Sequence, residues 1–274
     1  MGFSFDPGVI AALGLAEVLY VRAIRVLGAR GYEAPKGQQV AWHAGIALMA
    51  VALVSPLDGL GDDLLVAHMG QHLLIADLGA PLLLVGLRSP VYAFLLPKPA
   101  LVRLARVGWL RGIFRRLRGP LVAVPLWILI LYGWHFRFPF ESAVRHDWVH
   151  ALQHQSFVLG SVLVWWAVIE PKRRRAGGDL WKVPYLIGAR LPGMMLGMGF
   201  ILMRSVAYPD PYATRAPEHG WSAITDQQVA GGMMMGMDLV VMLFAVCFFF
   251  YRSSEDQDRA DLAERAERAA AVTS

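Results

Sequence analysis

The chain contains the pattern His-x-x-Gln-His twice, as His68-Met69-Gly70-Gln71-His72 and as His150-Ala151-Leu152-Gln153-His154. Each copy stands at the start of a long apolar run. Because residues four apart lie on one face of an α-helix, one turn above the other, each copy presents two imidazoles from one stripe of a helix. The two segments therefore predict two helices that each carry a pair of histidines.

The composition is that of a membrane protein. Hydrophobic residues make up 56% of the 274 positions and charged residues only 17%, whereas soluble domains are about 45–50% apolar. Several apolar runs reach about 20 residues, the length that crosses a bilayer as a helix. We therefore expect an all-α polytopic membrane protein. The net charge of +5 then reports orientation rather than nucleic-acid binding, so the expected surroundings are membrane lipid and no nucleic acid.

We expect a seven-transmembrane-helix bundle in residues 1–251 and a charged cytoplasmic tail in residues 252–274. The residues before the first apolar run carry no basic side chain and no cleavage pattern follows it, so we expect that run to remain as a membrane helix. Pro81 should kink the third helix. The basic connection at 88–119 is typical of an amphipathic segment on the bilayer surface. The helices are expected at about residues 9–27, 40–54, 64–87, 121–134, 148–169, 183–206 and 228–251.

The basic residues predict the orientation. Lysines and arginines concentrate in the links after the first, third and fifth helices and at the start of the tail, and few stand in the other links. Cytoplasmic links carry the excess of basic residues, so the N-terminus should lie outside and the C-terminus in the cytoplasm. The single cysteine, Cys247, excludes an internal disulfide and any Cys-x-x-Cys motif.

This orientation predicts one polar layer near the outer surface. His68 and His72 fall within about 12 Å of the outer end of their helix, at 1.5 Å per residue, and the second pair falls at similar depth. His43 belongs to the opposite end, and His146 and His219 to surface loops. The remaining candidates for the layer are His150, His154, His135 and the run Met233 to Met235.

A polar side chain at membrane depth is costly unless it is paired, and this indicates a functional site. Imidazole suits copper, zinc and iron, and thioether suits copper(I). The glutamines are candidate partners that fix the imidazole tautomers. For His135 an interfacial pair with Trp134 explains the residue equally well. For the methionine run, flexible core packing is the better explanation.

The chain resembles the CtaG family of cytochrome c oxidase assembly factors, the seven-helix kind associated with caa-type oxidases. The resemblance extends from about Trp42 to Met235 and includes both histidine segments. The other matching motifs are Ser55-Pro56-Leu57, Ala80-Pro81-Leu82-Leu83, Trp134-His135, Trp165-Trp166, Tyr208-Pro209 with Tyr212, and Asp226-Gln227-Gln228-x-Ala230-Gly231. Asp77 stands in a helix that the resemblance leads us to expect apolar.

The resemblance implies a bacterial plasma-membrane protein that matures heme-copper oxidase. Its expected role is to bind copper, as Cu(I), and deliver or insert it into the copper B centre of oxidase subunit I, with an extracytoplasmic copper donor as a further partner. The expected metal ligands are His68, His72, His150, His154 and His135, and the run Met233 to Met235 would form a soft transfer path.

Two other functions remain open from the residues alone. A heme-binding electron carrier would use axial histidines, although histidines four apart rise by only about 6 Å, too little for two stacked hemes. A metal or proton transporter would use Glu17, Asp77 and Asp238 as intramembrane carboxylates. No nucleophile–base motif, phosphate loop or metalloprotease signature stands in the sequence, so we expect no enzyme.

Overall fold

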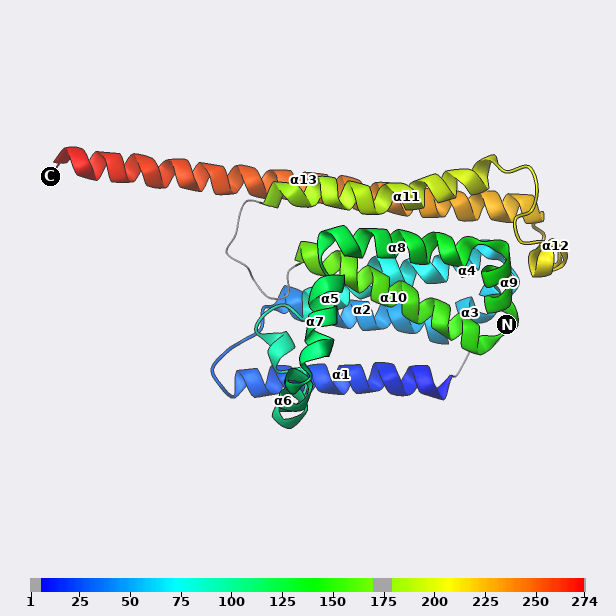
Figure 1. Ribbon diagram of the computed structural model, residues 1–274, viewed down its shortest axis with the longest axis horizontal. Coiled ribbons are helices and arrows are strands. Elements are labelled where there is room, and N and C mark those ends of the chain that lie inside the picture. Colours follow the sequence, from blue (N-terminus) through cyan, green and yellow to red (C-terminus); the bar gives the residue numbers. More distant parts are fainter. Residues whose placement is uncertain (1–5, 170–178, 274) are drawn as a thin grey trace.

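The computed structural model describes residues 6–169 and 179–273, and every regular element in those two segments is a helix. This confirms the all-α prediction. The long helices run nearly parallel to one another, and shorter ones cross or cap them at the two ends (Figure 1). The long helices are α1 (Pro7–Gly28), α2 (Lys36–Val54), α8 (Pro120–His135), α10 (Asp147–Ile169), α11 (Lys182–Leu202) and α13 (Ala223–Thr273).

The expected third membrane helix is one span built in three parts. It consists of α4 (Leu65–His72), a π-helical segment η1 (Leu73–Gly79) and α5 (Ala80–Gly86). Pro81 lies in the first turn of α5, directly after the π-helical segment. Proline supplies no N–H to the helical hydrogen-bond pattern, and the kink expected there stays a prediction.

Several helices are long and apolar enough to cross a membrane, so the chain is a multi-pass membrane protein. Five qualify singly, and a sixth if α7 (Gly108–Leu117) and α8, which meet at 78°, count as one broken span. This does not confirm the count of seven. The helix α1 has 22 residues but carries charged Glu17, Arg22 and Arg25, and α8 has only 16 residues, about 24 Å at 1.5 Å per residue.

Short helices occupy the links between the long helices. One end of the bundle carries α3 (Pro56–Gly61), α9 (Arg137–Arg145) and α12 (Pro209–Glu218) (Figure 1). The other end carries η2 (Val91–Ala93), α6 (Lys98–Arg106), α7 and η3 (Asp179–Trp181). The connections at 136–147 and 208–227 are partly helical, since they contain α9 and α12. Tertiary packing stabilises helices too short to persist alone.

The last helix continues far beyond the bundle (Figure 1). Because α13 runs unbroken from Ala223 to Thr273, the expected boundary between residues 251 and 252 falls inside a helix. The basic residues at 172–175, which contributed to the orientation, lie outside the described residues. The outside N-terminus, the cytoplasmic C-terminus and the two-part division of the chain stay predictions.

The largest apolar core lies where α2, η1, α8, α10 and α11 meet. Ile75 and Leu163 are fully buried there, and Trp127, Leu131 and Phe157 lie beside them. A second core, around Phe140, Phe200, Tyr208 and Tyr212, closes the end of the bundle that carries α9 and α12. The histidine segments lie between these two cores, and this positions the site described next.

Candidate metal centre

The two histidine pairs face each other across the contact between α4 and α10. The His68 and His150 rings stack with their centroids 5.0 Å apart, and His72 meets His154 edge-on at 5.3 Å. Within each helix the paired rings also touch, at 4.5 Å for His68 and His72 and 4.1 Å for His150 and His154. The structure therefore brings all four imidazoles into one cluster.

Three of the four histidines have metal-binding geometry among the described residues. One ring nitrogen from each of His68, His72 and His150 lies within 4.8 Å of the other two. Imidazole nitrogens bound to one ion at about 2.0–2.1 Å stand roughly 3.4 Å apart. Small side-chain rotations would therefore bring the three nitrogens onto one ion, while His154 lies beside them.

The imidazole cluster is buried but makes few hydrogen bonds. His68 has no exposed surface, His72 and His154 are below 9% exposed, and His150 is half-buried at the open side. Buried polar atoms nearly always have partners, yet several ring nitrogens have none within the described part of the chain. These are Nδ1 and Nε2 of both His68 and His72, and Nε2 of His150 and of His154. These ring nitrogens are therefore available, as lone pairs or N–H groups, to bind a ligand.

His135 lies apart from this cluster. Its ring is 6.2 Å from Phe140 and from Phe157, and those two phenylalanines contact His68 and His72 respectively. The Nδ1 atom is 2.7 Å from the carbonyl oxygen of Leu131 one turn earlier, which fixes Nε2 as the free nitrogen. That nitrogen is buried without a described partner. His135 is thus a neighbour of the four imidazoles across an aromatic layer.

The two glutamines have different surroundings. Gln71 donates to the Ala52 carbonyl at 2.9 Å and to the Asp58 carboxylate at 2.6 Å, so it ties α4 to α2 and α3 rather than orienting an imidazole. Gln153 is fully buried and lies next to His68. Its amide group has no hydrogen bond to a described residue. Only Gln153 therefore fits the expected role of imidazole partner.

A small cavity adjoins the cluster and brings methionines beside histidines. Met69 and Met234 line it together with His72 and His135, and both methionines are at most 5% exposed. The cavity offers about 30 Å³ to the centres of water molecules, which is enough for roughly two of them. Met234 is the member of the run Met233 to Met235 that lines this cavity.

Residues that sequence reasoning did not single out hold α4 in place. The carboxylate of buried Asp226 accepts hydrogen bonds from the backbone N–H groups of Leu65 at 2.7 Å and Val66 at 2.9 Å. It thereby caps, from α13, a helix whose own N-cap residue makes no side-chain bond. Tyr208 donates to the His135 carbonyl at 2.7 Å, and Tyr212 to the Gly61 carbonyl at 2.9 Å. Their appearance in the family motifs was the signal available in the sequence.

The intramembrane carboxylates form two separate groups. Asp77 of η1 and Asp238 of α13 both bind the guanidinium of Arg190, which lies on α11. Glu17 accepts from the Trp42 indole at 2.9 Å and lies 3.1 Å from His43. The carboxylates therefore form no chain across the bundle within the described residues.

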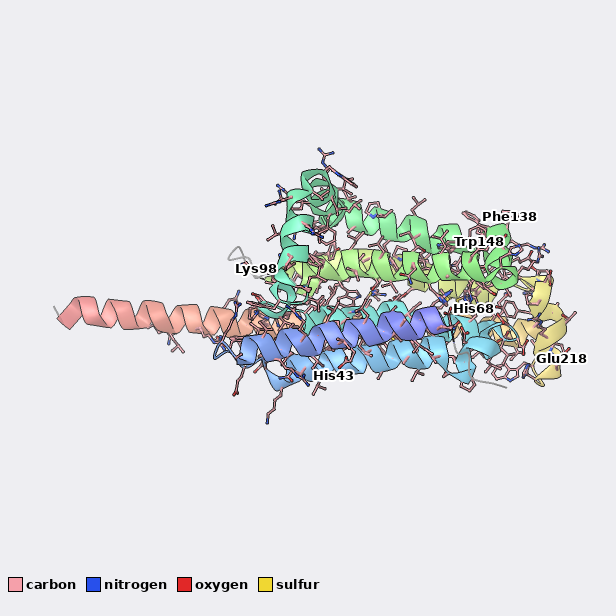
Figure 2. All side chains as sticks on the ribbon, turned by 90° about the horizontal axis from the view of Figure 1, so that it is seen from below. His43, His68, Lys98, Phe138, Trp148 and Glu218 are labelled. Atoms are coloured by element: carbon pink, nitrogen blue, oxygen red, sulfur yellow. The ribbon has the colours of Figure 1, made fainter. Side chains whose placement is uncertain are left out.

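The remaining histidines are not members of the imidazole cluster. Figure 2 shows His68 toward the end marked by Phe138, Trp148 and Glu218, whereas His43 lies toward the other end. His219 lies 3.1 Å from the Asp63 carboxylate, and His146 is exposed between α9 and α10.

The fold and the site together define a multi-pass helical membrane protein with a buried, unsatisfied imidazole cluster close to one end of its spans. Residues 18–256 match the model of the cytochrome c oxidase caa3 assembly factors, and the chain belongs to that family.

Two curated relatives share the same extent of similarity. They are "Uncharacterized protein Mb0105" of Mycobacterium bovis and "Uncharacterized protein MT0111" of Mycobacterium tuberculosis, each 27% identical over 281 residues. The alignments cover 94% of this chain and 40% of each relative, so the chain spans about two-fifths of the length of the curated relatives it matches. No solved structure matches the chain.

Proposed function

We propose that this oxidase assembly factor binds copper, as Cu(I), on His68, His72 and His150 and delivers it to the copper B centre of subunit I. His154 would take the ion next, and His135 with Met234 would complete the transfer path. In this reading copper is cargo rather than a resident cofactor, and the protein is no enzyme. The observation that carries the proposal is the set of buried ring nitrogens without described partners.

The donor set suits a soft, monovalent cation. Neutral imidazole and thioether sulfur both bind Cu(I) well, and Met69 and Met234 share the cavity wall with His72 and His135. The half-buried ring of His150 would be the entry point for an ion from an extracytoplasmic donor. The fully buried rings would then hold it away from water, which favours retention until the oxidase docks.

The alternatives fit the geometry less well. A heme between α4 and α10 needs the imidazoles on either side of a porphyrin, but these rings touch at 4.1–5.3 Å. A transporter that uses the three carboxylates would need them along one route, and Glu17 is bound separately to Trp42.

Equilibrium dialysis of purified protein against a buffered Cu(I) source tests the ligand assignment. The variants His68→Asn and His72→Asn should each lower the affinity by tenfold or more, because each removes a bond to the ion, while His219→Asn, outside the cluster, should bind like wild type. Retention of Cu(I) by a double His68→Asn/His72→Asn variant at wild-type affinity would refute the assignment. Circular dichroism of each variant reports whether the fold is retained.

The proposal also includes seven spans, with α1 and α8 added to the five that qualify singly, and an outside N-terminus in a bacterial plasma membrane. Single cysteines at positions 33 and 220 in a Cys247→Ser background test it in spheroplasts. A membrane-impermeant maleimide should label position 220, in the link between α12 and α13, and leave position 33 unlabelled until lysis. The reverse pattern would place the histidine cluster on the cytoplasmic side and contradict delivery from outside.

A further inference from the structure

Three charged side chains from separate helical elements, Asp77, Arg190 and Asp238, meet inside the bundle. Arg190 is 3% exposed, and Asp77 and Asp238 are each 8% exposed at the side chain. One nitrogen of the guanidinium, Nη1, donates to both carboxylates, at 3.3 Å in the case of Asp238. The guanidinium carbon of Arg190 lies over the ring of Trp165, 5.3 Å from the ring centroid. We call these three residues the charged triad.

The triad and the imidazoles share one cavity. Its wall includes all three triad residues together with His72 and His135. Arg190 Nε and the free nitrogen of His135 lack partners among the described residues, so waters in the cavity would find polar atoms on both sides. Gly193 keeps the space open, because a Cβ at that position would collide with the Asp238 carboxylate. The triad and two of the five candidate ligands, His72 and His135, therefore face one enclosed space, where charges are screened less than in water.

The charges of the triad do not balance. Two carboxylates and one guanidinium sum to a single negative charge, and an uncompensated charge is expensive in a membrane interior. A like-charged pair relieves this cost by holding one proton between its members. Among the described residues, the other titratable side chains that line the cavity are His72 and His135, and the phenol of Tyr185 lies near Arg190. These supply no fixed positive charge, so the balance must come from a proton or a bound cation.

We propose that the charged triad is a counter-charge for the ion at the histidine cluster, and that it exchanges one proton for one monovalent cation. With the cluster empty, the two carboxyls share a proton. When the cation binds, the O–H bond breaks and the proton leaves through the cavity to solvent. Both states then have the same net charge. A divalent ion would leave one positive charge unmatched, so the triad favours Cu(I) over Cu(II) or Zn(II). This inference rests on the proposed copper function and adds its charge selectivity.

Calorimetry with silver(I), a monovalent ion that needs no reductant, tests the exchange. Titrations at pH 7 in several buffers of different ionisation enthalpy give the number of protons released per ion bound. At that pH ordinary imidazoles are mostly neutral, since their pKa is about 6.5. Wild type should release about half to one proton per ion, and its affinity should rise about tenfold per pH unit in the range where the pair holds its proton.

The variants Asp77→Asn and Asp238→Asn remove one carboxyl each and should bind silver with almost no proton release and a flat pH profile. The matched control Asp63→Asn removes a carboxylate that pairs with Arg215 and His219 at the surface, and it should behave as wild type. Silver binding by wild type without proton release, or unchanged release in both triad variants, would overturn the inference and leave the copper site intact. Failure of wild type to bind silver or Cu(I) would overturn the copper proposal itself, and the inference with it.

Discussion

Replacing Asp226 should loosen the first turn of α4 and weaken metal binding from a distance. In wild type its carboxylate accepts two backbone N–H groups, at 2.7 Å from Leu65 and 2.9 Å from Val66. Leu65 is only 2% exposed, so water cannot easily replace the lost acceptor. A buried N–H without a partner costs about 1–3 kcal/mol. Two such groups in Asp226→Ala cost about 3 kcal/mol in total, and this multiplies the population of the frayed turn roughly a hundredfold.

The effect reaches the site because His68 follows Leu65 by only three residues, about 4.5 Å along the helix axis. Hydrogen–deuterium exchange should therefore show faster exchange of the amides at 65–68 in Asp226→Ala, together with weaker Cu(I) retention. Asp226→Asn keeps one acceptor oxygen and should give an intermediate result, and Asp63→Asn serves as a surface control. Unchanged exchange at the start of α4 in Asp226→Ala would refute the capping role, and faster exchange with unchanged Cu(I) affinity would refute its link to the site.

Two further predictions concern packing around the site. A Cβ on Gly231 would lie 2.5 Å from the Gly197 carbonyl oxygen. Gly231→Ala should therefore force α11 and α13 apart and lower the free energy of unfolding by about 1–3 kcal/mol. The control Gly232→Ala, with open space around its Cβ, should melt near the wild-type temperature. Tyr208→Phe loses the bond to the His135 carbonyl and should cost about 1 kcal/mol. Burial raises the pKa of Tyr208 above its unfolded value of about 10, so the contribution of this phenol to stability is complete below pH 10 and is lost as the pH rises further. The melting temperature of wild type should accordingly fall more steeply above pH 10 than that of Tyr208→Phe.

The sequence predicted the imidazole cluster better than its surroundings. The His-x-x-Gln-His spacing fixes which side chains share a helix face, and the basic links place both segments at equal depth, so the approach of His68 to His150 followed from local rules. The cap supplied by Asp226 joins residues about 160 positions apart in the chain. No periodicity reports such a contact. The separate position of His135, behind Phe140 and Phe157, could not be predicted from the sequence either, because it depends on how three helices pack.

The position of Asp77 on the wall of the imidazole cavity could not be predicted from the sequence for a more specific reason. In an α-helix a residue five positions after His72 points about 140° away from it, at 100° per residue. The segment Leu73–Gly79 is a π-helix, and the N–H of Ala80 bonds the carbonyl of Ile75 five residues earlier. A π-helix has about 4.4 residues per turn, so five residues advance about 410° and leave Asp77 only about 50° from His72. Asp77 thereby reaches the cavity wall that His72 also lines. With α-helical periodicity Asp77 would lie on another face of the span. The π-helical segment instead places it at the imidazole cavity. Deletion of Leu78, which restores α-helical pairing and leaves Asp77 five residues after His72, should therefore keep the span and separate the two groups. Deletion of Leu74 would put the aspartate four residues after His72 and should keep them on one face.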